Sequence, residues 1–179
     1  MYYTPEELVV MIPTPDLPPV DHAEPPLNRT CLSYWFPLIK AAGLAVPRTT
    51  IIPVERSREL CRVLDGESPP EFEELCRRVK EAADAMGYPC FFRTGQSSNK
   101  HDWNRTCFLA SAEAIPHHIA ALVEWSEICD FMGLPYDVWV VRELLKTSPA
   151  FHAFHGGMPI AREFRVFVQD GSLICQHPY

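Results

Sequence analysis

Apolar residues recur along residues 68–87 with the period of an amphipathic helix. Gly87 follows the last of them, as is typical of a helix C-terminus. A second segment, residues 114–133, has a similar pattern, ends at Gly133 and carries the pair His117-His118 in its first turn. We expect a helix in each segment, and shorter helices within residues 28–44 and 57–66.

Runs rich in β-branched and aromatic residues predict the strands. The final segment contains two such runs around Asp170-Gly171, a pair typical of a hairpin turn. Helices and strands do not alternate regularly along the chain, so the order predicts an α+β fold. The expected strands lie within residues 46–54, 88–94, 106–110 and 137–145, and the hairpin within residues 158–179.

Proline divides the chain. Residues 12–26 read IPTPDLPPVDHAEPP, which favours an extended spacer over a regular helix. We therefore expect three parts. A proline-rich segment spans residues 1–27, a first subdomain with its lead-in helix spans residues 28–137, and a strand that begins a second subdomain opens residues 138–179.

Composition excludes several classes of partner. The net charge of −7 argues against a general nucleic-acid binder, which would be basic. No apolar run is long enough to cross a bilayer, and the N-terminus lacks the layout of a signal peptide. The 7 cysteines are widely spaced without a CxxC pair, which favours reduced thiols. We expect a cytoplasmic protein with no nucleic-acid or membrane partner.

The stretch FFRTGQSSNKHDW, residues 91–103, is a candidate phosphate site. Arg93 ends an apolar run, a small loop containing Ser97 and Ser98 follows, and Lys100 lies just beyond. Such loops can hold phosphates through backbone N–H groups and hydroxyls. The spacing of a P-loop is absent. A solvated loop that carries a few charges is the alternative.

Two further strands end in charged residues. In VWVVRELL, residues 138–145, four apolar residues precede Arg142 and Glu143, and Leu145 follows, an arrangement that suits the edge of a pocket. In REFRVFV, Arg165 lies beside Glu163 on one face, and Arg162 on the other. The planar guanidinium suits phosphate oxygens. The alternatives are a core strand with a salt-bridged end and a surface ladder of opposite charges.

The segment between these strands, residues 146–159, contains His152, His155 and a Gly-Gly pair. Small residues here are compatible with a flap over a ligand. Two histidines could also bind a metal ion, but no cysteine or carboxylate accompanies them nearby, so we predict no metal ligand.

Over residues 28–179 the chain resembles the ATP-grasp superfamily. AAGLAVPRTTII, CFFRT, VVRELL and REFRVFV are similar, in order and spacing, to segments of bacterial and phage ATP-grasp-domain proteins and of the related chaperones that assemble initiation factor two. The resemblance implies a mixed or antiparallel sheet with helices on one side and an incomplete second subdomain. It also implies ATP as ligand, with carboxylate–amine ligase-like formation of an acyl phosphate in the complete protein.

The resemblance assigns roles to individual residues. Arg93 holds the place of a phosphate-contacting lysine, with Lys100 nearby. Glu143 and Leu145 would hold the base and sugar, and Arg162 and Arg165 would reach toward the phosphates. The Mg²⁺ ligands of the family would follow Tyr179, so we expect a fragment without them. The acceptor, a small molecule or a protein, is not specified. The alternative is a non-catalytic, nucleotide-dependent binding or assembly module.

Overall fold

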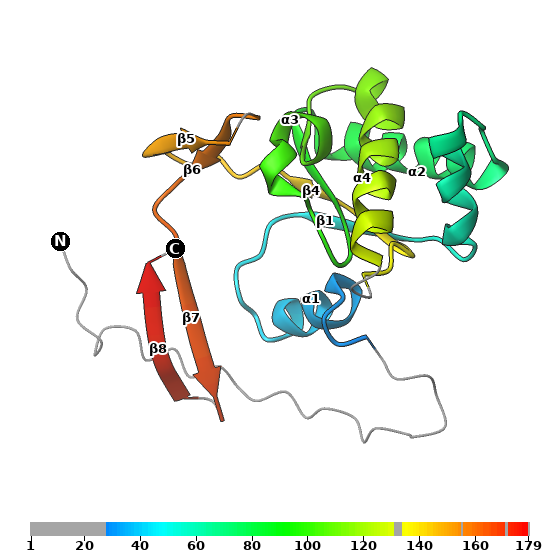
Figure 1. Ribbon diagram of the computed structural model, residues 1–179. Coiled ribbons are helices and arrows are strands. Elements are labelled where there is room, and N and C mark those ends of the chain that lie inside the picture. Colours follow the sequence, from blue (N-terminus) through cyan, green and yellow to red (C-terminus); the bar gives the residue numbers. More distant parts are fainter. Residues whose placement is uncertain (1–27, 131–133, 155, 171, 179) are drawn as a thin grey trace, which may run out of the picture.

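The computed structural model describes residues 28–130, 134–154, 156–170 and 172–178. Its centre is a four-stranded sheet in the order β1-β4-β2-β3, and all of its neighbouring strands are antiparallel (Figure 1). The α+β class is therefore confirmed. The strands are β1 (Thr49–Pro53), β2 (Cys90–Thr94), β3 (Phe108–Leu109) and β4 (Val138–Glu143). Strand β4, expected to open residues 138–179, lies between β1 and β2.

One face of the sheet packs against α2 (Pro70–Met86), α4 (Ile115–Asp130) and the 3-10 helix η2 (Ser57–Asp65). Phe92 and Trp139 stack there with ring centroids 5.5 Å apart. The predicted apolar positions of α2 face this core, and α2 ends where Gly87 takes φ 88°, a conformation that costs glycine little. The expected end of the second helix at Gly133 lies outside the described residues. Most of the core comes from this one layer.

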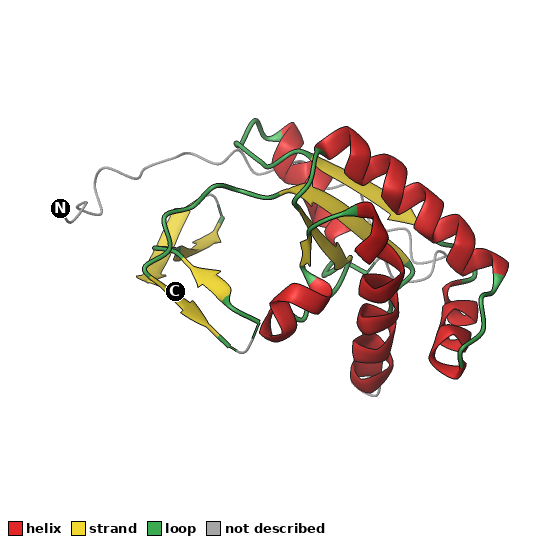
Figure 2. Ribbon diagram, turned by 90° about the horizontal axis from the view of Figure 1, so that it is seen from above, coloured by secondary structure: helices red, strands yellow, loops and turns green. Residues whose placement is uncertain are grey.

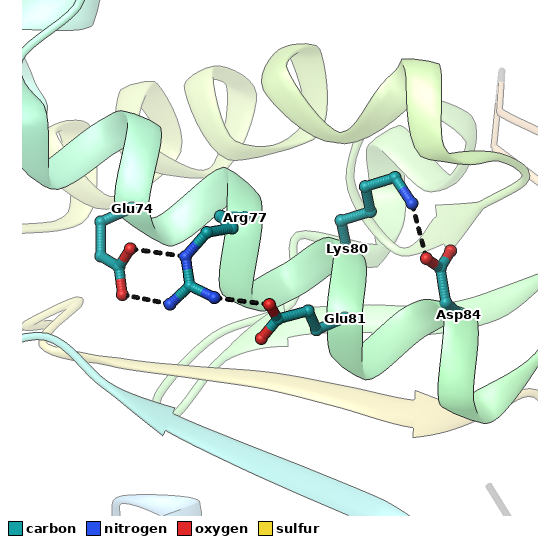
Figure 3. A network of polar contacts seen from close by, with 5 residues as sticks. All are labelled: Glu74, Arg77, Lys80, Glu81 and Asp84. Carbon is teal, nitrogen blue, oxygen red and sulfur yellow. Dashed lines mark hydrogen bonds and ion pairs between the residues drawn. The ribbon is translucent and has the colours of Figure 1, made fainter.

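The outer face of α2 carries solvated ion pairs (Figure 3). Arg77 binds Glu74 and Glu81, and Lys80 lies 2.6 Å from Asp84. Pairs of this kind on an exposed helix surface add little to stability. They account for Glu74, Glu81 and Asp84 without invoking a function.

The other face of the sheet is covered in part by α1 (Leu32–Ala41), which packs Leu32 and Phe36 on Val138 and Val140. The expectation of helices on one side only is therefore wrong. Side chains alternate along β4, and Val138 and Val140, which face away from α2 and α4, are apolar as well, so both faces of this part of the strand need a cover.

Residues 100–114 form short elements beside the sheet: η3 (Lys100–Asp102), α3 (Trp103–Thr106) and η4 (Ala112–Ala114). A small hairpin, β5 (Phe151–Ala153) and β6 (Met158–Ile160), packs on them. Met158 joins Trp103 and Cys107 in a separate apolar cluster. The sequence pattern assigned residues 158–160 to the final hairpin. That assignment is wrong, because they pair with residues 151–153.

The final hairpin consists of β7 (Phe164–Gln169) and β8 (Ser172–Pro178), with Asp170 in the turn at φ 51°. The hairpin is confirmed. The register shifts between Phe167 and Val168, so the simple alternation of faces predicted for this strand is broken there. In Figure 2 both small hairpins lie to one side of the helix-covered sheet.

Candidate nucleotide-binding pocket

Two of the predicted cations lie side by side on the sheet face that α1 covers only in part. In the β2–β4 register Phe91 pairs with Arg142 and Arg93 pairs with Val140, so both arginines face away from α2 and α4. The Arg142 guanidinium lies 5.9 Å from the centre of the Phe36 ring. Arg93 donates from Nε to the Thr94 carbonyl at 2.8 Å.

These arginines are half-buried like charges. Burial holds the pKa of Arg93 below its ordinary value, and the charge of Arg142 lowers it further. Burial also lowers the pKa of Arg142. Both groups remain charged, because an arginine side chain does not lose its proton in proteins. Among the described residues no carboxylate forms an ion pair with Arg93, Arg142 or Lys100. The cluster is suited to bind an anion.

The loop that leads to Lys100 is fixed through its own polar groups. The Ser97 N–H donates to Thr94 Oγ1 at 2.9 Å, and the Trp125 indole donates to Ser97 Oγ at 2.8 Å. The Ser98 carbonyl accepts from the Cys107 thiol at 2.7 Å. Asn99 has φ 44°, and η3 begins at the next residue. These contacts with Thr94, Trp125 and Cys107 fix the loop that places Lys100. Neither Ser97 nor Ser98 lines the pocket described next.

Lys100 and Arg142 line the same pocket, of about 200 Å³, between the end of β4, η3 and β6. Glu143 and Leu145 of the predicted set also line it. The apolar wall consists of Phe91, Trp103 and Met158. Phe91 and Trp103 are in ring contact, with centroids 5.8 Å apart. One wall of the pocket is therefore aromatic and apolar, and the polar wall carries two cations, Lys100 and Arg142, together with the carboxylates Glu143 and Glu163.

A larger hollow of about 810 Å³ adjoins this pocket. The two share part of their lining, and the larger one extends past Arg48 and the end of α2 to the β5–β6 hairpin. Their combined volume exceeds about 300 Å³, the lower end of the range for small-molecule sites. The shared residues are Trp103, Glu143, Leu144, Leu145, Thr147 and Pro159.

Glu143 differs from the neighbouring cations because it is already paired. Arg48 donates from Nε to Glu143 Oε2 at 2.9 Å, and this hydrogen bond is the main cause that lowers the pKa of Glu143. The carboxylate therefore stays ionised near neutral pH. It still lines both hollows.

The remaining predicted residues lie elsewhere. Arg162 and Arg165 line neither hollow. Arg165 lies on β7 opposite His177, within a hairpin whose two strands pack mainly on each other. Glu163 is the residue of this segment that lines the smaller pocket. His152 lines the larger hollow, and His155 lies outside the described residues.

Trp103, Met158 and Arg48 are among the pocket residues that were not predicted as site residues. The pattern could not show them because Trp103 sits in a one-turn helix and Met158 in a three-residue strand. Arg48 precedes β1 and reaches the pocket only through the pairing of β1 with β4. A tryptophan that closely follows the loop cations was the one available signal.

No family model matches the chain, and no curated protein matches it. Among the described residues no helix is long and apolar enough to cross a membrane. The same residues contain no group of three or more His, Cys, Asp or Glu side chains placed to hold a metal ion.

Proposed function

We propose that the protein binds ATP in this pocket, as a protein of ATP-grasp type. The observation that carries the proposal is the common lining: Lys100 and Arg142 face one space with the apolar wall of Phe91, Trp103 and Met158. Those residues come from segments far apart in the chain. Of the residues that the resemblance associates with one nucleotide, Lys100, Glu143 and Leu145 line this pocket.

The chemistry of the lining fits the parts of a nucleotide. Aromatic and apolar side chains suit the faces of a base, and cations suit the phosphates. Leu144 and Leu145 lie beyond the end of β4, so their backbone groups lie outside the ladder and can pair with the edge of a purine. Arg93 lies beside Arg142 and adds positive charge on the same face.

Bound ATP would supply an activated phosphoryl group, which in ligases of this type forms an acyl phosphate. The contribution of Lys100, Arg142 and Arg93 would be to orient the phosphates and to stabilise their negative charge. The ligase-like activity on a carboxylate acceptor, small molecule or protein, belongs to this proposal. We assign no Mg²⁺ ligand, since the described residues offer no cluster for one.

Calorimetric titration with ATP tests the proposal. Lys100→Ala and Arg142→Ala each remove a cation from the pocket wall. We expect each to weaken binding by about 1–3 kcal/mol, the usual range for hydrogen bonds to charged groups, which is roughly a 5- to 150-fold rise in Kd.

Lys80→Ala is the matched control, because Lys80 pairs with Asp84 on the outer face of α2, away from the pocket (Figure 3). It should leave the Kd unchanged. Pocket variants that bind ATP as tightly as the parent protein would show that the phosphate assignment is wrong.

A further inference from the structure

Arg48 and Glu143 hold each other through three contacts at the edge of the sheet. The Arg48 N–H donates to Glu143 Oε1 at 3.1 Å, and Arg48 Nε donates to Oε2 at 2.9 Å. The third contact is between backbone groups: the Glu143 N–H donates to the Arg48 carbonyl at 3.0 Å. Each carboxylate oxygen therefore already accepts one hydrogen bond from the same residue.

The pair is also tied to a helix. Arg48 Nη2 donates to the carbonyl of Met86, the last residue of α2, at 3.0 Å. Its guanidinium is thus fixed at one end by a backbone group and at the other by the carboxylate. This arrangement restricts the rotamers of Glu143, whose side chain is 31% exposed and borders both hollows.

An ionised carboxylate is a pure acceptor with about four lone-pair positions. Arg48 takes two of them. The positions that remain accept no hydrogen bond from the described residues, so donor groups of a ligand can replace the water that solvates them. The pocket edge at Glu143 is therefore suited to hydroxyl groups, and a vicinal pair on a sugar matches one carboxylate.

We propose that Arg48 is a positioning residue that aims the Glu143 carboxylate at the ribose hydroxyls of the bound nucleotide. The preference for ribonucleotide over 2′-deoxyribonucleotide then depends on Arg48, although Arg48 itself does not contact the sugar. This inference rests on the proposed function, since it takes the ligand to be ATP.

The test compares the Kd values of ATP and 2′-deoxy-ATP for the parent protein and for Arg48→Met, which keeps the length of the side chain without its donors. We expect the parent to favour ATP by about tenfold, a typical effect of one hydrogen bond to a charged group. In Arg48→Met this ratio should fall toward unity, mainly because ATP binds more weakly. Arg48→Lys should fall in between, because an ammonium lacks the planar fork.

Arg78→Met is the matched control. Arg78 ties α2 to the other end of β1 by donating to the Pro53 carbonyl at 2.7 Å, so its loss removes a similar structural contact. It should leave the ratio as in the parent. In a Glu143→Gln background, Arg48→Met should no longer change the ratio.

The outcomes are separable. An unchanged ratio in an Arg48→Met protein that binds ATP overturns the inference, as does an equal loss of both nucleotides, which indicates a merely structural role. Should Arg48→Met fail to fold, Arg48→Lys decides by the same ratio. A parent that binds both nucleotides equally overturns the inference and leaves the proposed function standing. A parent that binds neither overturns the proposed function as well.

Discussion

At the scale of single residues, hydrogen bonds from buried side chains link the core to the pocket, and those that begin at His118 are the clearest example. The sequence placed His117-His118 in the first turn of a helix, and helical geometry turns the two side chains apart. His117 is exposed, whereas His118 is buried and its Nδ1 donates to the Thr106 carbonyl at 2.9 Å. The Thr106 hydroxyl in turn donates to the Asn99 carbonyl at 2.8 Å, next to Lys100. A buried histidine of α4 therefore supports the loop that carries a pocket cation.

Stability should fall with acid because of His118. Burial holds the pKa of His118 below its ordinary value. The hydrogen bond to the Thr106 carbonyl raises this pKa, the nearby His117 lowers it and Asp102 raises it. As the pH falls through the ordinary value, the unfolded chain takes up this proton first. The contribution of His118 to the free energy of unfolding should thus be fully present near about pH 7.5 and should decline toward about pH 5.5. Urea unfolding checks this, and His118→Gln should flatten the decline. Equal slopes for parent and variant would contradict the assignment.

At this scale the sequence revealed which residues carry charge but not which ones meet. Lys100 and Arg142 were both predicted, and the structure places them in one pocket. Arg48 was missed because its role depends on the β1–β4 register, which no local pattern specifies. Ser97 was predicted to be a ligand donor, yet its hydroxyl accepts from Trp125, a contact between elements distant in sequence.

Among the elements, the long ones were predictable and the short ones were not. Helix α2 repeats its apolar positions over several turns, so its period is unambiguous. Strands β5 and β6 have three residues each, too few for any period. They form the wall of the pocket through Met158, and Phe154 of the same hairpin stacks on His101 with ring centroids 4.2 Å apart. The least predictable element therefore closes the candidate site.

Gly156 allows this hairpin to pack closely on α3. A Cβ atom added there would lie 2.7 Å from the backbone nitrogen of Trp103, so a side chain must push the hairpin or α3 away. We expect Gly156→Ala to lower the free energy of unfolding by about 1–3 kcal/mol, as for overpacked sites, and to weaken ATP binding. Urea unfolding and calorimetry measure the two effects.

Gly66→Asn is the control, because Gly66 lines neither hollow. Gly66 has φ 82°, nothing lies within 4 Å of its added Cβ, and asparagine tolerates this conformation. It should bind ATP as the parent does. If Gly156→Ala also binds ATP as the parent does, the hairpin does not form a functional wall.

At the scale of the whole molecule, the four-stranded sheet and its helices form a packed body, and the final hairpin of β7 and β8 forms a ribbon that adds little to the core of this body. Strands β7 and β8 contact mainly each other, and large apolar side chains on both strands are exposed. Two strands alone are only marginally stable in water. The exposed residues are Phe164, Val166, Phe167, Val168 and Ile174.

A chain ending at Ala161 tests the ribbon for both stability and binding. Because the ribbon adds little to the core, the urea midpoint of the shortened chain should match that of the parent. The resemblance gives Arg162 and Arg165 a role at the phosphates, but neither lines a hollow, so we expect the affinity for ATP to stay unchanged. A lower midpoint would show that the ribbon supports the body, and a fall in affinity would show that the removed residues contribute to ATP binding.

The two neighbouring guanidinium groups on β2 and β4 also bear on how the protein should be handled. Their mutual repulsion is present whenever the face is empty, and any multivalent counterion that settles between them relieves it. Inorganic pyrophosphate, with no base or sugar, should therefore raise the melting temperature, and the rise should continue with the logarithm of its concentration above the Kd. Sulfate- or phosphate-rich solutions would then mask weak nucleotide binding, so titrations belong in chloride buffers.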